Sequence, residues 1–423
     1  MQTRGQQPMQ TNSLARGLRG HQPIYQRILP LALLCLLLTL SGCGLPRIQA
    51  EDRLFLPLSL ELLDESILPS QDIENTRIGG LSAITYDRQT GNYYALSDDR
   101  GFVSPARFYT LSIDIGGDDP DLFQIRKITI EDVTLLRDEA GEPFPPGTID
   151  PEGIALSPDR TLFIASEGVS QDGIPPFVDE FDLSTGRRLR ALPIPNYMIP
   201  DAAGSEQTLG VQNNLGFESL TIGGVGTGEP YRVFAATESA LLQDLPWIEE
   251  QRQQAPADDP IPLTTRLLHY VVVENRAQVV AEHLYPLDEP PSLLTVNNGL
   301  VELLALDGAN ALRSRPGGYF LSLERTFGAE GFGAKLFQMA IASASDISTL
   351  TYLQGDAKDF QPVQKQLLLN LNYLEGFRPD NLEGMTFGPR LPDGSQSLIL
   401  VSDDNFRDNQ VNQFVLLRLT AER

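Results

Sequence analysis

The sequence of 423 residues contains little cysteine and little histidine, and these shortages exclude several classes of site. Its cysteines are Cys35, inside an apolar segment near the N-terminus, and Cys43. A disulfide framework and a thiolate zinc site therefore have no basis. Only three histidines occur, with no close pair, and no Gly-x-Ser-x-Gly motif is found. These absences argue against a histidine-rich zinc site and against a serine esterase of the α/β-hydrolase type.

The chain also lacks an apolar run long enough to span a membrane. The run Ile28 to Leu40 is about a dozen residues, whereas a spanning helix needs roughly 20. Residues 1–42 contain four arginines and no acid, which predicts a signal peptide. The following Leu40 to Gly44 resembles the bacterial lipobox, in which a Cys receives lipid and becomes the mature N-terminus. An ordinary secretory signal with a nearby Cys is the alternative.

On this interpretation the chain has three parts: a lipoprotein signal peptide (1–42), a lipid-anchored tether beginning at Cys43 (43–52) and one folded domain (53–423). The lipid on Cys43 would tether the protein to the outer face of a bacterial membrane, in the periplasm or cell envelope. We expect a monomer whose membrane contact is this lipid.

Basic residues are scarce. The sequence has 32 Lys and Arg against 56 Asp and Glu, and removal of residues 1–42 leaves 28 basic residues against the same 56 acids. Such a charge excludes nucleic acid as a partner. Two interpretations remain for the acids: a solvated surface, or carboxylates gathered into sites for divalent cations.

Helical periodicity of twelve or more residues is missing after residue 60, although Asp244 to Gln254 and Gly333 to Ala342 could form short helices. Short apolar runs joined by turns predict β-hairpins instead. The segment Leu81 to Tyr86 followed by Tyr93 to Ser97 is typical. Similar pairs are Gly153 to Ser157 with Thr161 to Ser166, and Gly384 to Phe387 with Ser397 to Ser402.

One hairpin pattern occurs in five copies along the chain. Each first strand has a Gly, a short polar residue or an acid near its start, and each second strand ends in Ser or Thr followed by an acid; in one copy this spacing slips by one residue. The copies are Gly80–Ser82 with Ser97–Arg100, Pro151–Gly153 with Ser166–Gly168, Phe217–Ser219 with Thr237–Ser239, Val301–Leu303 with Ser322–Arg325, and Leu382–Gly384 with Ser402–Asn405.

Repeated sheets that each direct one strand at a common axis predict an all-β fold, a β-propeller with an acid-lined central mouth. Ring closure would pair Leu54 to Leu63 with the C-terminal segment Phe414 to Leu419, because pairing the two ends removes the open edges.

The repeated acids are candidate calcium ligands, because calcium takes six to eight oxygen ligands at flexible geometry. Some of them could instead accept hydrogen bonds from backbone amides of neighbouring blades. The candidate metal ligands are Asp98, Asp99, Glu152, Glu167, Glu218, Glu238, Glu302, Glu324, Glu383, Asp403 and Asp404. Glu218 and Glu238 are also candidate catalytic carboxylates. Arg100 and Arg325 directly follow ring acids and are candidates for gripping phosphate oxygens, or for pairing with those acids.

The order of these motifs is similar to that of a known family. Ser97 to Arg100, Leu382 to Met385 and Ser402 to Phe406 resemble segments of the phytase-like domain, named for an esterase-like activity of phytase. The resemblance spans roughly Ile78 to Leu419. It implies a propeller of six blades, with calcium held by carboxylates at its mouth and hydrolysis of phosphate esters as the type activity.

We therefore expect a calcium-dependent phosphoester hydrolase whose substrate is a small molecule. Two alternatives stay open. One is a non-catalytic propeller that binds a ligand or protein, since propellers serve as binding platforms as readily as enzymes. The other is a metal-dependent lactonase or carboxylesterase.

Overall fold

A computed structural model describes residues 54–117, 123–223, 230–256, 260–274, 276–290, 292, 294–306 and 318–421. The predicted signal peptide, Cys43 and the tether lie outside these residues. No helix among the described residues is long and apolar enough to cross a membrane.

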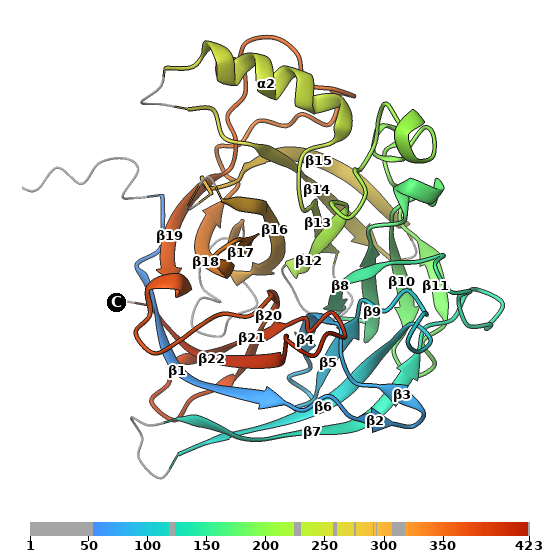
Figure 1. The fold of residues 1–423 in the computed structure, drawn as a ribbon, viewed down its shortest axis with the longest axis vertical. Helices are drawn as coiled ribbons and strands as arrows, with labels where there is room; N and C mark the ends of the chain where they lie inside the picture. The colour runs from blue at the N-terminus through green and yellow to red at the C-terminus, as the bar shows by residue number, and fades with distance from the viewer. Residues whose placement is uncertain are drawn as a thin grey trace, which may run out of the picture. The chain divides into compact units, whose positions relative to one another are not determined.

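The described residues form five four-stranded antiparallel sheets arranged around one axis (Figure 1). Each sheet is a blade, ordered from the axis outward. The first blade comprises β4 (Leu81–Tyr86), β5 (Tyr93–Ser97), β6 (Arg107–Gly116) and β7 (Gln124–Leu135). The second comprises β8 (Pro151–Leu156), β9 (Thr161–Ser166), β10 (Phe177–Asp182) and β11 (Arg188–Ala191). The third comprises β12 (Phe217–Gly223), β13 (Tyr231–Thr237), β14 (Thr264–Val273) and β15 (Arg276–Pro286).

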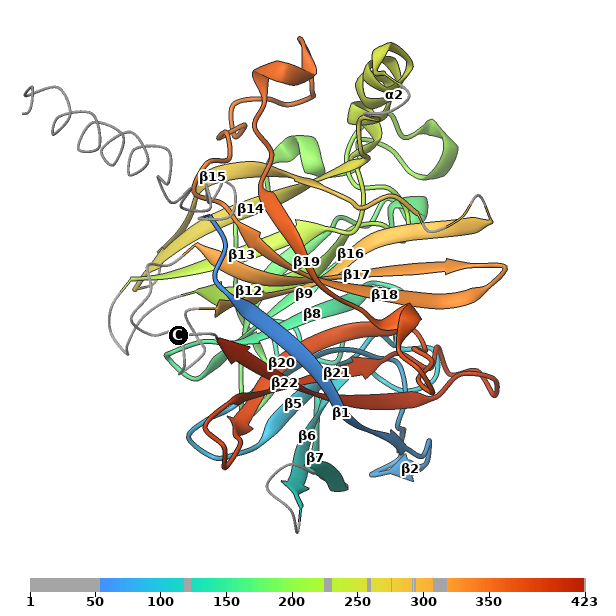
Figure 2. The ribbon, with the colours of Figure 1, turned by 90° about the vertical axis from the view of Figure 1, so that its left-hand side faces the viewer.

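The fourth blade comprises β16 (Thr295–Ala305), β17 (Tyr319–Gly328), β18 (Gly331–Ala340) and β19 (Gln364–Asn370). Seen from the side, β17 and β18 form a long projecting hairpin (Figure 2). The fifth comprises β20 (Leu382–Arg390), β21 (Gln396–Ser402), β22 (Asn412–Ala421) and β1 (Leu58–Leu68). A small hairpin of β2 (Asp72–Ile73) and β3 (Thr76–Arg77) links β1 to the first blade.

Ring closure follows the expected pairing of the two chain ends. β1 runs antiparallel to β22, with Leu58 opposite Ala421 and Leu68 opposite Asn412. The inner strand β20 of this blade packs against β4 of the first. The fifth blade therefore combines strands from both ends of the domain, and neither end leaves an open sheet edge at the junction.

The core lies between neighbouring blades. Apolar side chains of one sheet pack on those of the next, as Phe163 and Tyr231 do with an edge-on ring contact 6.2 Å between centroids. The inner strands are buried on both faces, which explains why their sequences read as short apolar runs rather than as clean alternation.

The propeller class is confirmed, but the implied count of six blades is wrong. Each of the five sequence copies forms one inner hairpin: β4–β5, β8–β9, β12–β13, β16–β17 and β20–β21. Long outer strands and connecting segments, rather than a sixth sheet, account for the wide spacing of the copies.

The helix expected within Asp244 to Gln254 is present as α2 (Leu245–Gln254), whereas Gly333 to Ala342 lies almost entirely in strand β18. Short 3₁₀ helices occur in connections: Ser170–Asp172, Asn196–Met198, Gly204–Glu206, Leu242–Asp244, Ala357–Asp359 and Leu371–Tyr373.

Candidate active site at the acidic mouth

Every inner strand carries a β-bulge, which lies at its second residue in four strands and in the middle of β16. In β8, for example, Pro151 and Gly153 pair with consecutive residues of β9, so that Glu152 has no partner in the ladder. A bulge re-aims the side chain of its unpaired residue, and bulges are common beside active sites. The five bulged residues are Ser82, Glu152, Glu218, Val301 and Glu383.

The second strand of each blade supplies another set of equivalent positions. Each of them directly follows the residue that pairs with the residue before the bulge. In three blades that pairing residue is Ser, as in the pair Leu382 and Ser402, and in a fourth it is Thr237. The next residue is directed to the same mouth of the ring. These residues are Asp98, Glu167, Glu238, Arg325 and Asp403.

The fourth blade departs from the pattern, because Leu300 pairs with Glu324 and Glu302 pairs with Leu323. Arg325 therefore takes the position of an acid, and Glu324 takes that of Ser or Thr. Glu324 accepts hydrogen bonds from Tyr285 Oη (2.7 Å) and the Asp288 amide (2.8 Å) and forms an ion pair with Lys365.

Glu302 accepts backbone N–H groups of Leu220 (3.3 Å) and Leu303 (2.9 Å). It thus holds neighbouring inner strands together. Hydrogen bonding to backbone amides was the alternative role that the sequence left open for some of the acids. The one-residue slip seen in the sequence thereby removes both Glu302 and Glu324 from the group of acids at the mouth.

Asp99 and Asp404 also lie apart from that group. Asp99 accepts four successive backbone N–H groups of the following loop and pairs with the buried Arg107 at 2.9 Å. Asp404 accepts hydrogen bonds from the Gly80 amide (2.8 Å) and from Asn412 Nδ2 (3.0 Å). Both carboxylates hold loops at the mouth in place.

Seven of the predicted acids come together: Asp98, Glu152, Glu167, Glu218, Glu238, Glu383 and Asp403. Asp150 joins them and was missed by sequence reasoning. It lies directly before β8 and two residues from Glu152, so the run Asp-Pro-Glu was the available signal. We refer to these eight residues as the acidic mouth.

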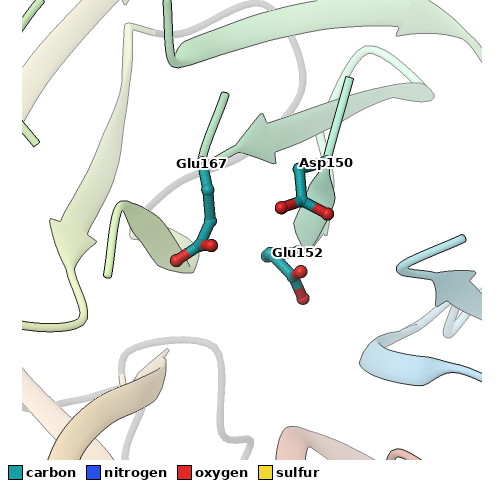
Figure 3. A group of neighbouring side chains, drawn as sticks. All are labelled: Asp150, Glu152 and Glu167. Atoms are coloured by element: carbon teal, nitrogen blue, oxygen red, sulfur yellow. The ribbon is translucent and has the colours of Figure 1, made fainter. Parts of the chain in front are cut away.

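Two subsets of the acidic mouth have the geometry of a cation site. Asp150, Glu152 and Glu167 offer carboxylate oxygens within 4.8 Å of one another, as do Glu167, Glu218 and Glu238. Figure 3 shows the first group, in which the carboxyl groups of Asp150 and Glu167 approach the same space from the ends of β8 and β9. Glu167 belongs to both groups and so joins them.

Two arginines face these acids, as the sequence predicted from their position. Arg100 forms an ion pair with Asp150 and donates to Asn214 Oδ1 at 2.7 Å. Arg325 lies 3.2 Å from Glu383, 3.3 Å from Glu238 and 3.8 Å from Glu218. Only part of Arg100 is exposed, at 26% of its side chain, and Arg325 is nearly buried at 11%.

Burial is the main influence on the ionisation of the acidic mouth. It raises the pKa of Glu383 to about 8 and that of Asp403 to about 7, although Arg325 opposes both shifts. Burial, reinforced by neighbouring carboxylates, also raises the pKa values of four further acids well above their ordinary values: Asp98, Glu152, Glu167 and Glu218. For Asp98, the neighbouring charges include that of Asp403. Eight carboxyl groups face two guanidinium groups, so protons or cations must supply the remaining positive charge.

A cavity of about 790 Å³ lies beside the acidic mouth, between the β2–β3 hairpin and the β21–β22 loop. Phe406 lines it and packs over Gly80, where a Cβ would lie 2.8 Å from the Phe406 ring and 2.0 Å from Asp98 Oδ1. Gly80 has a φ of +62° and Phe406 a φ of +52°, a left-handed conformation unusual for an aromatic residue. This strained loop separates the cavity from the carboxylates.

A family model described as phytase-like, esterase-like activity of phytase, matches residues 76–406. The chain belongs to the phytase-like family. A comparison with curated proteins gave no match.

Several solved structures are similar to this phytase-like chain. An endo-arabinase from Bacteroides thetaiotaomicron shares 9% identity, with 84% of this chain and 98% of that one covered and a TM-score of 0.41. A β-fructofuranosidase from Bombyx mori shares 11%, covering 93% and 67%, with a TM-score of 0.35. The catalytic domain of an α-L-arabinofuranosidase from Coprinopsis cinerea shares 10%, covering 86% and 97%, also with a TM-score of 0.35.

The acidic mouth of this family member has acidic groups that can hold a metal. Buried oxygens of Asp98 (Oδ1), Glu218 (Oε2) and Glu238 (Oε2) have no hydrogen-bond partner. Buried polar atoms are normally paired, so these oxygens require a proton or a cation. The donors are all carboxylate oxygens, which suit calcium or magnesium better than zinc.

Proposed function

We propose that the protein is a calcium-dependent phosphoester hydrolase that acts on a small-molecule substrate at the acidic mouth. The observation that carries the proposal is the convergence of eight carboxyl groups from four blades, with unpartnered buried oxygens among them. The phytase-like family, described by an esterase-like activity of phytase, agrees with hydrolysis of an ester.

The residues that would hold calcium are Asp150, Glu152 and Glu167, whose oxygens already lie within 4.8 Å of one another. Bound there, calcium would supply positive charge that polarises the ester and offsets the charge of its phosphate. An anionic substrate would otherwise be repelled, because the carboxylates of the acidic mouth outnumber its arginines.

The chain's own residues would position the ester and manage protons. Arg100 is partly exposed and can direct N–H donors at phosphate oxygens when it exchanges part of its contact with Asn214. Glu218 or Glu238 would donate a proton to the leaving oxygen, since burial raises the pKa of both and an unpartnered oxygen of each is buried there.

A metal-dependent lactonase or carboxylesterase is the second candidate, and the contacts of Arg325 favour it. This guanidinium is bound by three carboxylates and is nearly buried. One of the two candidate phosphate-binding groups is therefore already neutralised. A neutral carboxylic ester needs no such group and would require only a polarised carbonyl and a water.

The test is a screen of purified protein against phosphate monoesters, phosphate diesters and lactones, with calcium and with a chelator. We expect calcium-dependent turnover of a phosphate ester, lost in Glu152→Gln. The matched control is Glu250→Gln, at an exposed position of helix α2, which should retain full activity. Lactone turnover alone would replace the first candidate by the second, and no turnover of any ester would leave a binding propeller.

We also propose that lipid on Cys43 anchors the protein to the membrane. β1 begins at Leu58, opposite Ala421, whereas Leu68 and Asn412 lie at the other end of the blade, where Asn412 contacts Asp404. The chain therefore enters the propeller at the end of the blade away from the acidic mouth. A lipid attached before β1 would leave that mouth open to substrates in the periplasm or cell envelope.

A further inference from the structure

Arg325 occupies a position that four other blades give to an acid. Equivalent positions carry Asp98, Glu167, Glu238 and Asp403, as the strand register shows. The bulge position of the same blade carries Val301 rather than an acid. The fourth blade therefore contributes a cation and no carboxylate to the acidic mouth.

The guanidinium meets its carboxylates in an unusual way. Nη2 is the nitrogen of all three ion pairs, with Glu383, Glu238 and Glu218 at 3.2, 3.3 and 3.8 Å. Arginine usually binds a carboxylate through two parallel N–H groups. Here one nitrogen lies among three carboxylates from two blades, and Nε has no hydrogen-bond partner. Nη2 thus acts as a point charge.

The surrounding oxygens are not fully satisfied by this nitrogen. Glu238 is completely buried, and its Oε2 has no partner; Oε2 of Glu218 is likewise unpaired. These two residues and Glu167 form the second group with cation-site geometry. Glu238 packs on Gly299, where a Cβ would lie 2.2 Å from Oε1, so the glycine leaves the room that this carboxylate occupies.

We propose that the Arg325 guanidinium stands in for a divalent cation among Glu218, Glu238 and Glu383. The native mouth then binds one cation fewer than its carboxylates would otherwise hold, and replacing Arg325 by a neutral residue creates a calcium site. This inference deepens the proposed function and rests on it for the first site, at Asp150, Glu152 and Glu167. On this view the acidic mouth binds a single calcium ion, and the Arg325 guanidinium supplies a second positive charge beside it.

The experiment counts calcium equivalents by isothermal titration of the metal-free, full-length protein with calcium chloride alone. Arg325→Gln should bind one equivalent more than the native protein, and Arg325→Lys, which keeps a cation, should match the native count. An unchanged count in Arg325→Gln would overturn the inference. Because the result is the difference between two proteins, it is separate from the proposed function, which fails if the native protein binds no calcium or hydrolyses no ester.

A matched control and a second variant complete the design. Arg266 is fully buried and pairs with Asp244 and Glu282, away from the mouth. Arg266→Gln should lose stability without gaining a calcium equivalent. If Arg325→Gln does not fold, the native arginine can be kept and Glu218→Gln tested: its calcium count should equal that of the native protein, and a lost equivalent would show that Glu218 binds calcium despite Arg325.

Discussion

The ionisation of the acidic mouth predicts that the metal-free protein becomes less stable as pH rises, in contrast to most proteins over the acidic range. Folding raises the pKa of Glu383 from 4.5 to about 8 and that of Asp403 from 3.8 to about 7. Between pH 5 and 7 the folded state therefore holds protons that the unfolded chain has released. Stability from a raised pKa is complete below the unfolded value and is lost as pH rises through the folded value.

The expected slope can be worked out from these two groups. Each extra proton on the folded state lowers the free energy of unfolding by about 1.4 kcal/mol per pH unit, so Glu383 and Asp403 together give up to about 3 kcal/mol per unit between pH 5 and 7. Calcium replaces protons of the mouth and should flatten this slope. It should also add about 2.7 kcal/mol at a hundredfold excess over its Kd.

The assay is urea unfolding at a series of pH values from 5 to 8.5, in chelator and in calcium. Glu383→Gln should reduce the slope in chelator by about 1.4 kcal/mol per pH unit, because its neutral amide cannot titrate whereas Asp403 still does. The reasoning is refuted if stability in chelator rises over this range, or if calcium leaves the slope unchanged.

Two further predictions concern the ends of the chain. Cys43→Ser should leave unprocessed precursor or release soluble protein; detergent partitioning of a normally cleaved variant would show that Cys43 carries no lipid anchor. Deletion of residues 54–68 should remove β1 and expose the edge of β22, lowering the melting temperature and promoting self-association on size exclusion. An unchanged, monomeric variant would show that β1 contributes little to ring closure.

The fold was accessible from the sequence because each blade repeats a local signal. The apolar run Leu81 to Tyr86 and its turn predicted β4, and the five copies predicted five inner hairpins. The number of blades was taken instead from the family resemblance, which implied six, whereas the structure has five. Outer strands were harder to predict: β18 is buried at most positions, so Gly333 to Ala342 lacks the alternation that would separate a strand from a helix.

The acidic mouth could be predicted only in part, because the position of a β-bulge cannot be read from the sequence. The motif places an acid near the start of a strand, but the register decides whether that acid is the bulged residue, as Glu152 is, or the next one, as Glu302 is. Asp99 and Asp404 each follow an acid of the mouth by one residue, and their side chains bind backbone amides instead. Adjacent residues cannot be assigned to metal or backbone without the loop conformation.

Glu302 gives a direct test of this register argument. It is 1% exposed, its Oε1 accepts the Leu220 and Leu303 amides, and burial raises its pKa well above the ordinary value. Burial disfavours the charged form of this carboxyl group, and glutamine, which is neutral and keeps an acceptor oxygen, is its close match. Glu302→Gln should change the free energy of unfolding by less than about 1 kcal/mol, whereas Glu302→Ala removes an acceptor of two amides and leaves a void, at a cost of about 3 kcal/mol or more.

The readout that separates structure from metal binding is the calcium titration. Both Glu302 variants that fold should keep the native calcium count, while Glu152→Gln should weaken or abolish binding, since Glu152 alone of the two residues occupies the bulge. Equal losses in Glu302→Gln and Glu152→Gln would mean that Glu302 reaches the cation. The bulge would then no longer distinguish the carboxylates that bind metal from those that hold the inner strands together.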